Sequence, residues 1–115
     1  MNDEDLKLVT LARGASLRAH VPHTGVAAGA AVRDVDGRTY AGALVENADP
    51  ALTTSALRAA VVAAASSGAR RFEAAAVVVA GDFDDSDLGV LSEFGTGVPV
   101  FVAGPDGALR ETRSS

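Results

Sequence analysis

Carboxylates, hydroxyls and two histidines are the side chains in this sequence that could do chemistry, because the chain contains no cysteine. That rules out thiolate nucleophiles, disulfides, iron–sulfur clusters and cysteine-ligated zinc. Four aspartates fall within residues 82–87, and Asp84 and Asp87 among them share one short segment. Carboxylates are hard ligands that suit Mg²⁺, Ca²⁺ or Mn²⁺. The alternative, which we favour, is a solvated loop whose charges face the positive end of the next helix.

Three further side chains are of types that act in catalysis, but the partner residues that catalysis needs are missing. His20 and His23 flank Pro22, and together they could bind a metal or act as acid and base. No third ligand is in view for them, so we interpret residues 20–25 as a surface loop. Ser55 could be a nucleophile only beside a general base, and no histidine is placed to act as one.

Hydrophobic spacing and turn residues predict the elements that must position these side chains. Asp36-Gly37 separates two short apolar runs and indicates a β-hairpin. Thr53 or Thr54 is expected to cap a helix that runs to about Ser67. This helix is apolar on nearly every face, which is typical of a buried helix. The other expected helices are residues 3–19 and 86–94, and the expected strands are residues 26–33, 39–46, 73–80, 98–103 and 108–115.

The order of these elements predicts an α/β fold. Hairpin strands pair antiparallel, whereas strands joined through helices run parallel. We therefore expect a mixed sheet covered by helices, which is a three-layer α/β/α arrangement.

Length and charge bound the class of protein further. The 115 residues, with a net charge of -5, predict a single domain, residues 1–115. The longest apolar stretch without a charge, residues 59–69, is too short to span a bilayer. The first five residues include three acidic side chains, Asp3, Glu4 and Asp5, unlike a secretion signal. We expect a cytoplasmic protein with no membrane partner and no nucleic-acid partner, because net negative charge opposes binding to a phosphate backbone.

A series of short motifs resembles the small homotetrameric cytidine deaminases. The motifs are Gly29-Ala30-Ala31-Val32, Asp36-Gly37-Arg38-Thr39, Val45-Glu46-Asn47-Ala48 and a helix that ends at Gly68. The strand over residues 72–80 and the segment 90–94 also correspond, so the resemblance covers about residues 11–110. It implies the cytidine deaminase-like fold and a homo-oligomer, a dimer or a tetramer, since the family packs subunits through the helices that carry its motif.

The family uses these positions for zinc chemistry, and the resemblance implies that this chain has lost it. The family's Cys-Ala-Glu-Arg helix opening corresponds to residues 55–58, so Ser55 replaces a zinc ligand and Leu57 replaces the proton-shuttling glutamate. By spacing, the other two cysteine ligands fall near Asp84 and Asp87. A hydroxyl is a weak zinc donor and leucine transfers no proton. We therefore expect no catalytic residue and no cofactor, with Asp84 and Asp87 as weak candidates for a metal.

Most substrate-binding positions of the family are changed as well. The residue that stacks on the base corresponds to Val26, and the asparagine that meets the ribose corresponds to Leu44. The glutamate that reads the sugar hydroxyls is kept as Glu46. Glu46 and Asn47 are thus the candidate substrate-binding residues. The alternative is that Asn47 and its neighbours only turn the chain between strand and helix.

Two functions remain open. The first, which we favour, is a non-catalytic pseudoenzyme that acts as an oligomeric interaction module or binds a nucleoside weakly. An interaction role predicts that Leu44 and Leu57 fill the pocket. The second is a residual nucleoside deaminase-type hydrolase, or a ligand-binding protein, that uses Glu46 and the acidic loop Asp82–Asp87. It predicts an open cavity with a divalent ion beside that loop. The expected partner is accordingly a nucleoside or a protein.

Overall fold

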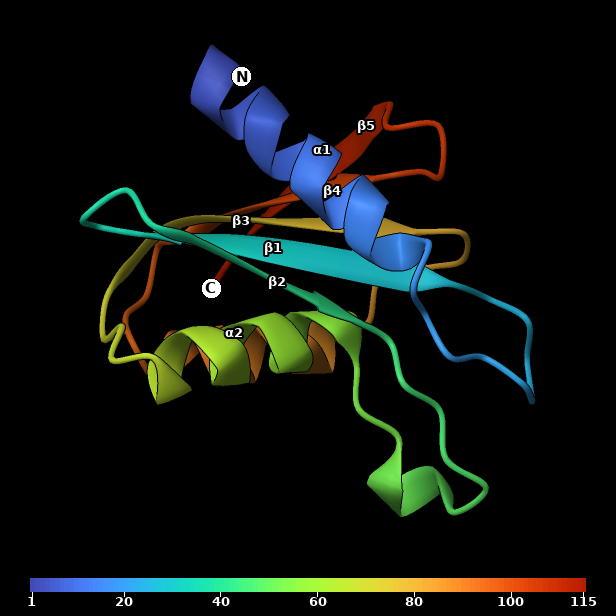
Figure 1. Ribbon diagram of the computed structural model, residues 1–115. Helices are drawn as coiled ribbons and strands as arrows, with labels where there is room; N and C mark the ends of the chain where they lie inside the picture. The colour runs from blue at the N-terminus through green and yellow to red at the C-terminus, as the bar shows by residue number, and fades with distance from the viewer.

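A five-stranded mixed sheet forms the centre of the computed structural model, which describes residues 1–115 (Figure 1). The strands are β1 (Ala28–Asp34), β2 (Thr39–Ala43), β3 (Phe72–Val79), β4 (Pro99–Ala103) and β5 (Leu109–Ser114). Their spatial order is β2-β1-β3-β4-β5. β1 pairs antiparallel with β2 and β3, β3 pairs parallel with β4, and β5 pairs antiparallel with β4. The predicted α/β fold with a mixed sheet is confirmed.

Helices cover both faces of the sheet. The α-helices are α1 (Asp3–Ser16), α2 (Ala56–Ser66) and α3 (Leu88–Ser92), and the 3₁₀ turns are η1 (Pro50–Leu52) and η2 (Asp85–Asp87). α1 lies on one face and α2 on the other (Figure 1). Alternate residues of β1 serve the two faces: Ala31 belongs to the core that contains Leu8 of α1, and Val32 to the core that contains Leu57 of α2. These two cores produce the predicted three layers.

Two glycines let the helices approach the sheet closely. A Cβ on Gly29 of β1 would lie 2.2 Å from the backbone oxygen of Ala12 in α1. A Cβ on Gly42 of β2 would lie 2.5 Å from the backbone nitrogen of Ala60 in α2. Real Cβ atoms do not make contacts this short, so neither position admits a side chain without moving a helix. The alanine-rich sequence thus packs backbone close to backbone.

An ion-pair network ties α1 to the sheet. Arg33 of β1 projects toward α1, where its guanidinium lies 3.0 Å from the Asp5 carboxylate. The same side chain pairs with Glu73 of β3. Arg33 and Asp5 are both largely buried, at 11% and 13% side-chain exposure. Buried partners of this kind specify one orientation of the helix, because separating them would leave a charge uncompensated.

The start of α2 differs from the prediction. Ser55, rather than Thr53 or Thr54, caps the helix: its Oγ accepts a hydrogen bond of 3.3 Å from the Arg58 N–H. Thr54 is instead extended, because its backbone N–H and carbonyl both bond with Val45. The position of the cap depends on a tertiary contact, because the bridge to Val45 keeps Thr54 extended and the helix begins after it.

The surroundings of α2 also differ from the prediction of a helix buried on every side. Its Leu57 and Ala60 face the core, whereas Val62 is 57% exposed and Ala63 is exposed as well. A helix that lies on one face of a sheet turns its outer side to solvent. The expected third helix over 86–94 is likewise shorter, because η2 precedes the α-helical part. None of the helices combines the length and apolarity needed to cross a bilayer.

Candidate ligand-binding site

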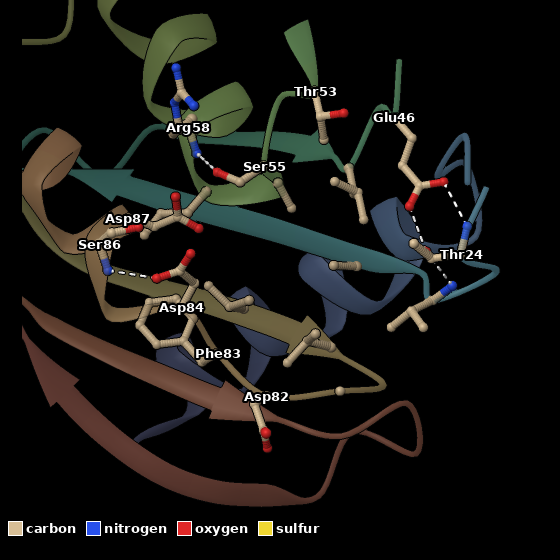
Figure 2. Close-up of a pocket in the computed structure, with 18 of the residues that line it drawn as sticks. Thr24, Glu46, Thr53, Ser55, Arg58, Asp82, Phe83, Asp84, Ser86 and Asp87 are labelled. Atoms are coloured by element: carbon tan, nitrogen blue, oxygen red, sulfur yellow. Dashed lines mark hydrogen bonds between the residues drawn. The ribbon is translucent and has the colours of Figure 1, made fainter. Parts of the chain in front are cut away.

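A cavity of about 490 Å³ opens where β2 and β3 end and α2 begins (Figure 2). Its lining comes from residues within 24–28, 44–46, 50–58, 77–79 and 81–87. Leu44 and Leu57 both line it. The expectation that these two leucines fill the space is wrong. Leu57 is drawn into the core at 1% exposure, and Leu44 only partly packs against that core, so the cavity stays open.

The N-terminal turn of α2 and its cap residue line the cavity with Ser55, Ala56, Leu57 and Arg58. The Ser55 Oγ serves as the helix cap, so one of its two lone pairs is engaged with the backbone. Leu57 lies two residues further along the chain, and it belongs to the larger core cluster. No proton can move through this side chain. The cavity wall at residue 57 is consequently apolar and inert.

Asp84 and Asp87 face Ser55 across the same space (Figure 2). Asp84 caps η2 by accepting a hydrogen bond of 2.9 Å from the Ser86 N–H, and this backbone bond lowers the pKa of its carboxyl group. Partial burial raises the pKa of Asp87, and the charge of Asp84 adds to that shift. The hydroxyl of Ser55 and the positive charge of Arg58 act in the opposite direction. Asp87 makes no capping bond, so its carboxylate is held in the cavity without a backbone donor.

The zinc that the family resemblance implies does not fit these side chains. Protein zinc sites use thiolate, imidazole or carboxylate ligands around one metal. Here the donors are one hydroxyl and two carboxylates, and the hydroxyl is already a helix cap. Within residues 1–115, no group of three or more His, Cys, Asp or Glu side chains is arranged to hold a metal ion. We therefore derive no chemical step through a metal.

Glu46 is the polar residue most firmly fixed at the cavity rim, and it is buried at 8% exposure. Its Oε1 accepts backbone hydrogen bonds from His23 and Thr24, at 3.0 and 3.2 Å, and its Oε2 accepts one from the Thr24 hydroxyl. The Thr24 hydroxyl is the largest cause that lowers the pKa of Glu46, and the two backbone donors add to it. Glu46 is thus ionised at neutral pH, and it anchors the loop before β1 to the strand end after β2.

Asn47 does shape the chain, and it also borders a second cavity. Its Oδ1 accepts a bond of 2.9 Å from the Asp49 N–H, and its own N–H donates to the Thr53 Oγ1 at 3.0 Å. These bonds form the turn between strand and helix. A neighbouring cavity of about 420 Å³ is lined by Asn47, whereas the first cavity is not.

The loop over residues 20–25 contributes more than its sequence indicated. His20 and His23 are exposed, as the surface-loop interpretation predicts. The backbone of His23 and the whole of Thr24 nevertheless bind Glu46. The sequence analysis missed Thr24, and it missed Phe83, which lines the cavity beside the aspartates. No local pattern marks either residue, because their role depends on segments more than twenty positions away.

Comparisons with known proteins agree with this architecture. The family model described as cytidine deaminase-like matches residues 1–107. The crystal structure of a cytidine deaminase from Burkholderia pseudomallei is 29% identical, with a TM-score of 0.87, over 99% of this chain and 93% of that one. The cytidine deaminase of Mycobacterium tuberculosis is 31% identical, with a TM-score of 0.78, over 96% of this chain and 91% of that one. A search of the curated proteins found no match.

The chain therefore belongs to the cytidine deaminase-like family. The family model extends over nearly the whole length of this chain, and the two matches cover almost the whole length of those two crystal structures as well. The cavity of about 490 Å³ lies at the start of α2, where the resemblance places the family's chemistry, and residues within 55–58 and 84–87 line it.

Proposed function

We propose that this protein binds a nucleoside without deaminating it, as a pseudoenzyme of the cytidine deaminase-like family. The observation that carries the proposal is an open cavity of about 490 Å³ whose wall is hydrocarbon at Leu57. A cavity of this size is in the range of small-molecule sites. Its apolar lining includes Val77 and Phe83, and its rim presents the ionised carboxylate of Glu46.

The wall of the cavity supports binding rather than hydrolysis. A flat base can be held by apolar side chains such as Val77, Val79 and Phe83, which need no further partner. Sugar hydroxyl groups can donate to the Glu46 carboxylate, as the resemblance implies. Deamination, in contrast, requires an activated water and a group that shuttles protons. Leu57 occupies the shuttle position, and the oxygen donors beside it do not form a zinc site.

Titration calorimetry with cytidine tests the proposal directly. We expect saturable binding, no release of ammonia during prolonged incubation, and no stoichiometric zinc in the purified protein. The variant Gly81→Leu should abolish the binding heat, because Gly81 lines the cavity and a Cβ there would contact only Val26, at 3.6 Å. Gly89→Leu is the matched control, since a Cβ on Gly89 meets nothing and this residue does not line the cavity.

Two results would overturn the proposal. Absence of cytidine binding by the folded wild-type protein and by Gly89→Leu would remove the binding role. Ammonia release that stops on chelation would show that the chain is a deaminase, which is the residual-hydrolase alternative using Glu46 and the acidic loop.

The proposal includes self-association through the outer side of α2. Val62 is 57% exposed there and is surrounded by small side chains such as Ala63 and Ser66. Small residues allow two helices to approach closely. Sedimentation velocity is expected to show a dimer or tetramer that Val62→Glu converts to a monomer, whereas Leu17→Glu, on the opposite layer, leaves it intact. A monomeric wild-type protein at micromolar concentration would contradict this part of the proposal.

A further inference from the structure

The two cavities share part of their lining, and Figure 2 labels three of the shared residues at the rim of the first cavity: Thr24, Glu46 and Thr53. Four residues line both cavities: Thr24, Glu46, Pro50 and Thr53. Three residues line only the second cavity: His23, Asn47 and Ala48. Shared lining residues place these spaces of about 490 and 420 Å³ next to each other, so that we refer to the shared residues as the wall.

The wall and the second cavity keep hydrogen-bonding capacity that the fold does not use. A carboxylate oxygen has two acceptor positions, and the Oε2 of Glu46 uses one, for the Thr24 hydroxyl. The Oγ1 of Thr53 accepts from a backbone N–H, which leaves its own proton to donate. The Asn47 amide uses its oxygen in the turn, so its NH₂ group has two donors left. The imidazole of His23 is exposed. The space thus has both acceptors and donors in its lining.

The charge of the second cavity selects the kind of group that it can hold. No lysine or arginine lines it, and Glu46, which is ionised at neutral pH, is the one acidic residue in its lining. A phosphate would meet that negative charge with no lysine or arginine beside it, which costs binding free energy at short range. An uncharged group with several hydroxyls can both donate to the carboxylate and accept from Asn47 and Thr53.

We infer that the second cavity is a subsite for an uncharged, hydroxyl-rich group carried on the ribose of the nucleoside. The full ligand is then a glycosylated nucleoside or a compound of that class, rather than a free nucleoside or a nucleotide. This inference rests on the proposed function, because the base and ribose of the ligand occupy the first cavity. The ribose end is the one that meets the wall, since Glu46 is the group expected to read its hydroxyls.

Calorimetry with a small series of ligands tests the inference. The probes are cytidine, cytidine 5′-monophosphate, and three glucosyl cytidines that carry glucose on each ribose hydroxyl in turn. Two new hydrogen bonds at about 1 kcal/mol each would tighten binding roughly tenfold to thirtyfold. At least one glucosyl cytidine is expected to bind tighter than cytidine by about that factor, and the monophosphate is expected to bind no tighter than cytidine.

Two histidine variants locate the effect in the second cavity. His23→Ala removes the imidazole but keeps the backbone N–H that holds Glu46, so it should reduce severalfold the ratio between the affinities for glucosyl cytidine and for cytidine. His20→Ala is the matched control, because His20 is exposed in the same loop and lines neither cavity.

The outcomes separate this inference from the proposed function. If cytidine binds but no glucosyl cytidine binds tighter, or if both histidine variants behave alike, the second subsite is wrong and the nucleoside pocket stands. If the monophosphate binds tighter than cytidine, the charge argument is wrong. If none of the ligands binds, the nucleoside pocket itself is wrong, and the subsite falls with it.

Discussion

Truncating Leu57 tests whether this residue, which the resemblance aligns with the family's proton shuttle, is part of the hydrophobic core. Leu57 is 1% exposed and belongs to the cluster between the sheet and α2. Leu57→Ala removes three carbon atoms from that environment, which is worth about 2.4 kcal/mol at ~0.8 kcal/mol per carbon. Core truncations of this type usually cost about 2–5 kcal/mol, and the upper values come from sealed voids. Here the vacated space joins a cavity already open beside residue 57, so we expect about 2–3 kcal/mol.

Urea unfolding followed by circular dichroism measures this loss. With a slope of about 1–3 kcal/mol per molar urea, the midpoint should fall by roughly 1–2 M. Protein concentration must be held constant, because the proposed self-association would add stability that depends on concentration. Leu52→Ala is the matched control: Leu52 is 62% exposed, and its truncation should change stability by no more than about 0.5 kcal/mol. Equal midpoints for the two variants would refute the assignment of Leu57 to the core.

Three further predictions concern the polar residues of the cavity and its rim. Asp87→Asn should stabilise the protein at neutral pH. The raised folded-state pKa makes stability fall as pH rises from the ordinary value of 3.8 through the raised one, and Asn removes that cost. Urea midpoints measured across this pH range should show the advantage of Asn fading toward pH 3.8. Glu46→Gln should have the opposite sign: the lowered pKa means that stability from Glu46 is present above its ordinary value of 4.5 and lost as pH falls through the folded-state value. The variant is therefore less stable at neutral pH and converges with wild type in acid, as thermal melts can record. Val26→Phe should tighten cytidine binding about twofold to tenfold in calorimetry, because Val26 lines the cavity at 40% exposure and an aromatic ring there can stack on the base.

Each of these predictions has a clear contrary result. Destabilisation by Asp87→Asn at neutral pH would mean that the carboxylate makes a favourable contact that partial burial does not outweigh. A Glu46→Gln difference that persists unchanged in acid would show that the charge of Glu46 is not what holds Thr24. For the third variant, Val26→Leu is the control, and equal cytidine affinities for Leu and Phe would indicate that the base does not lie near this rim.

Retention of the fold without the zinc donors has a physical explanation. The architecture depends on close packing of small residues, such as Gly29 against α1 and Gly42 against α2, and none of these contacts involves a metal. An aliphatic side chain at position 57 also avoids the desolvation cost of several kcal/mol that a buried carboxylate there would carry. The cytidine deaminase-like framework can therefore persist on packing alone, with its cavity open.

Much of the architecture followed from local patterns in the sequence. The hairpin was readable because Asp36-Gly37 interrupts two apolar runs, and Gly37 does adopt the positive φ that such a turn requires. The end of α2 was readable because Gly68 stops it, again at positive φ. Such signals involve residues only a few positions apart. Even so, the helix start was placed wrongly, because a distant partner, Val45, holds Thr54 extended.

The sequence by itself determined the order of helices and strands, the acidic character of the chain and the types of side chain available for chemistry. The tertiary structure alone decided that Leu57 packs into the core beside an open cavity, and that Thr24 lies against Glu46 from 22 positions away. It alone revealed a second space behind that pair. The reason is that secondary structure responds to near neighbours, whereas the volume of a cavity depends on how well segments distant in the chain fill the region between them.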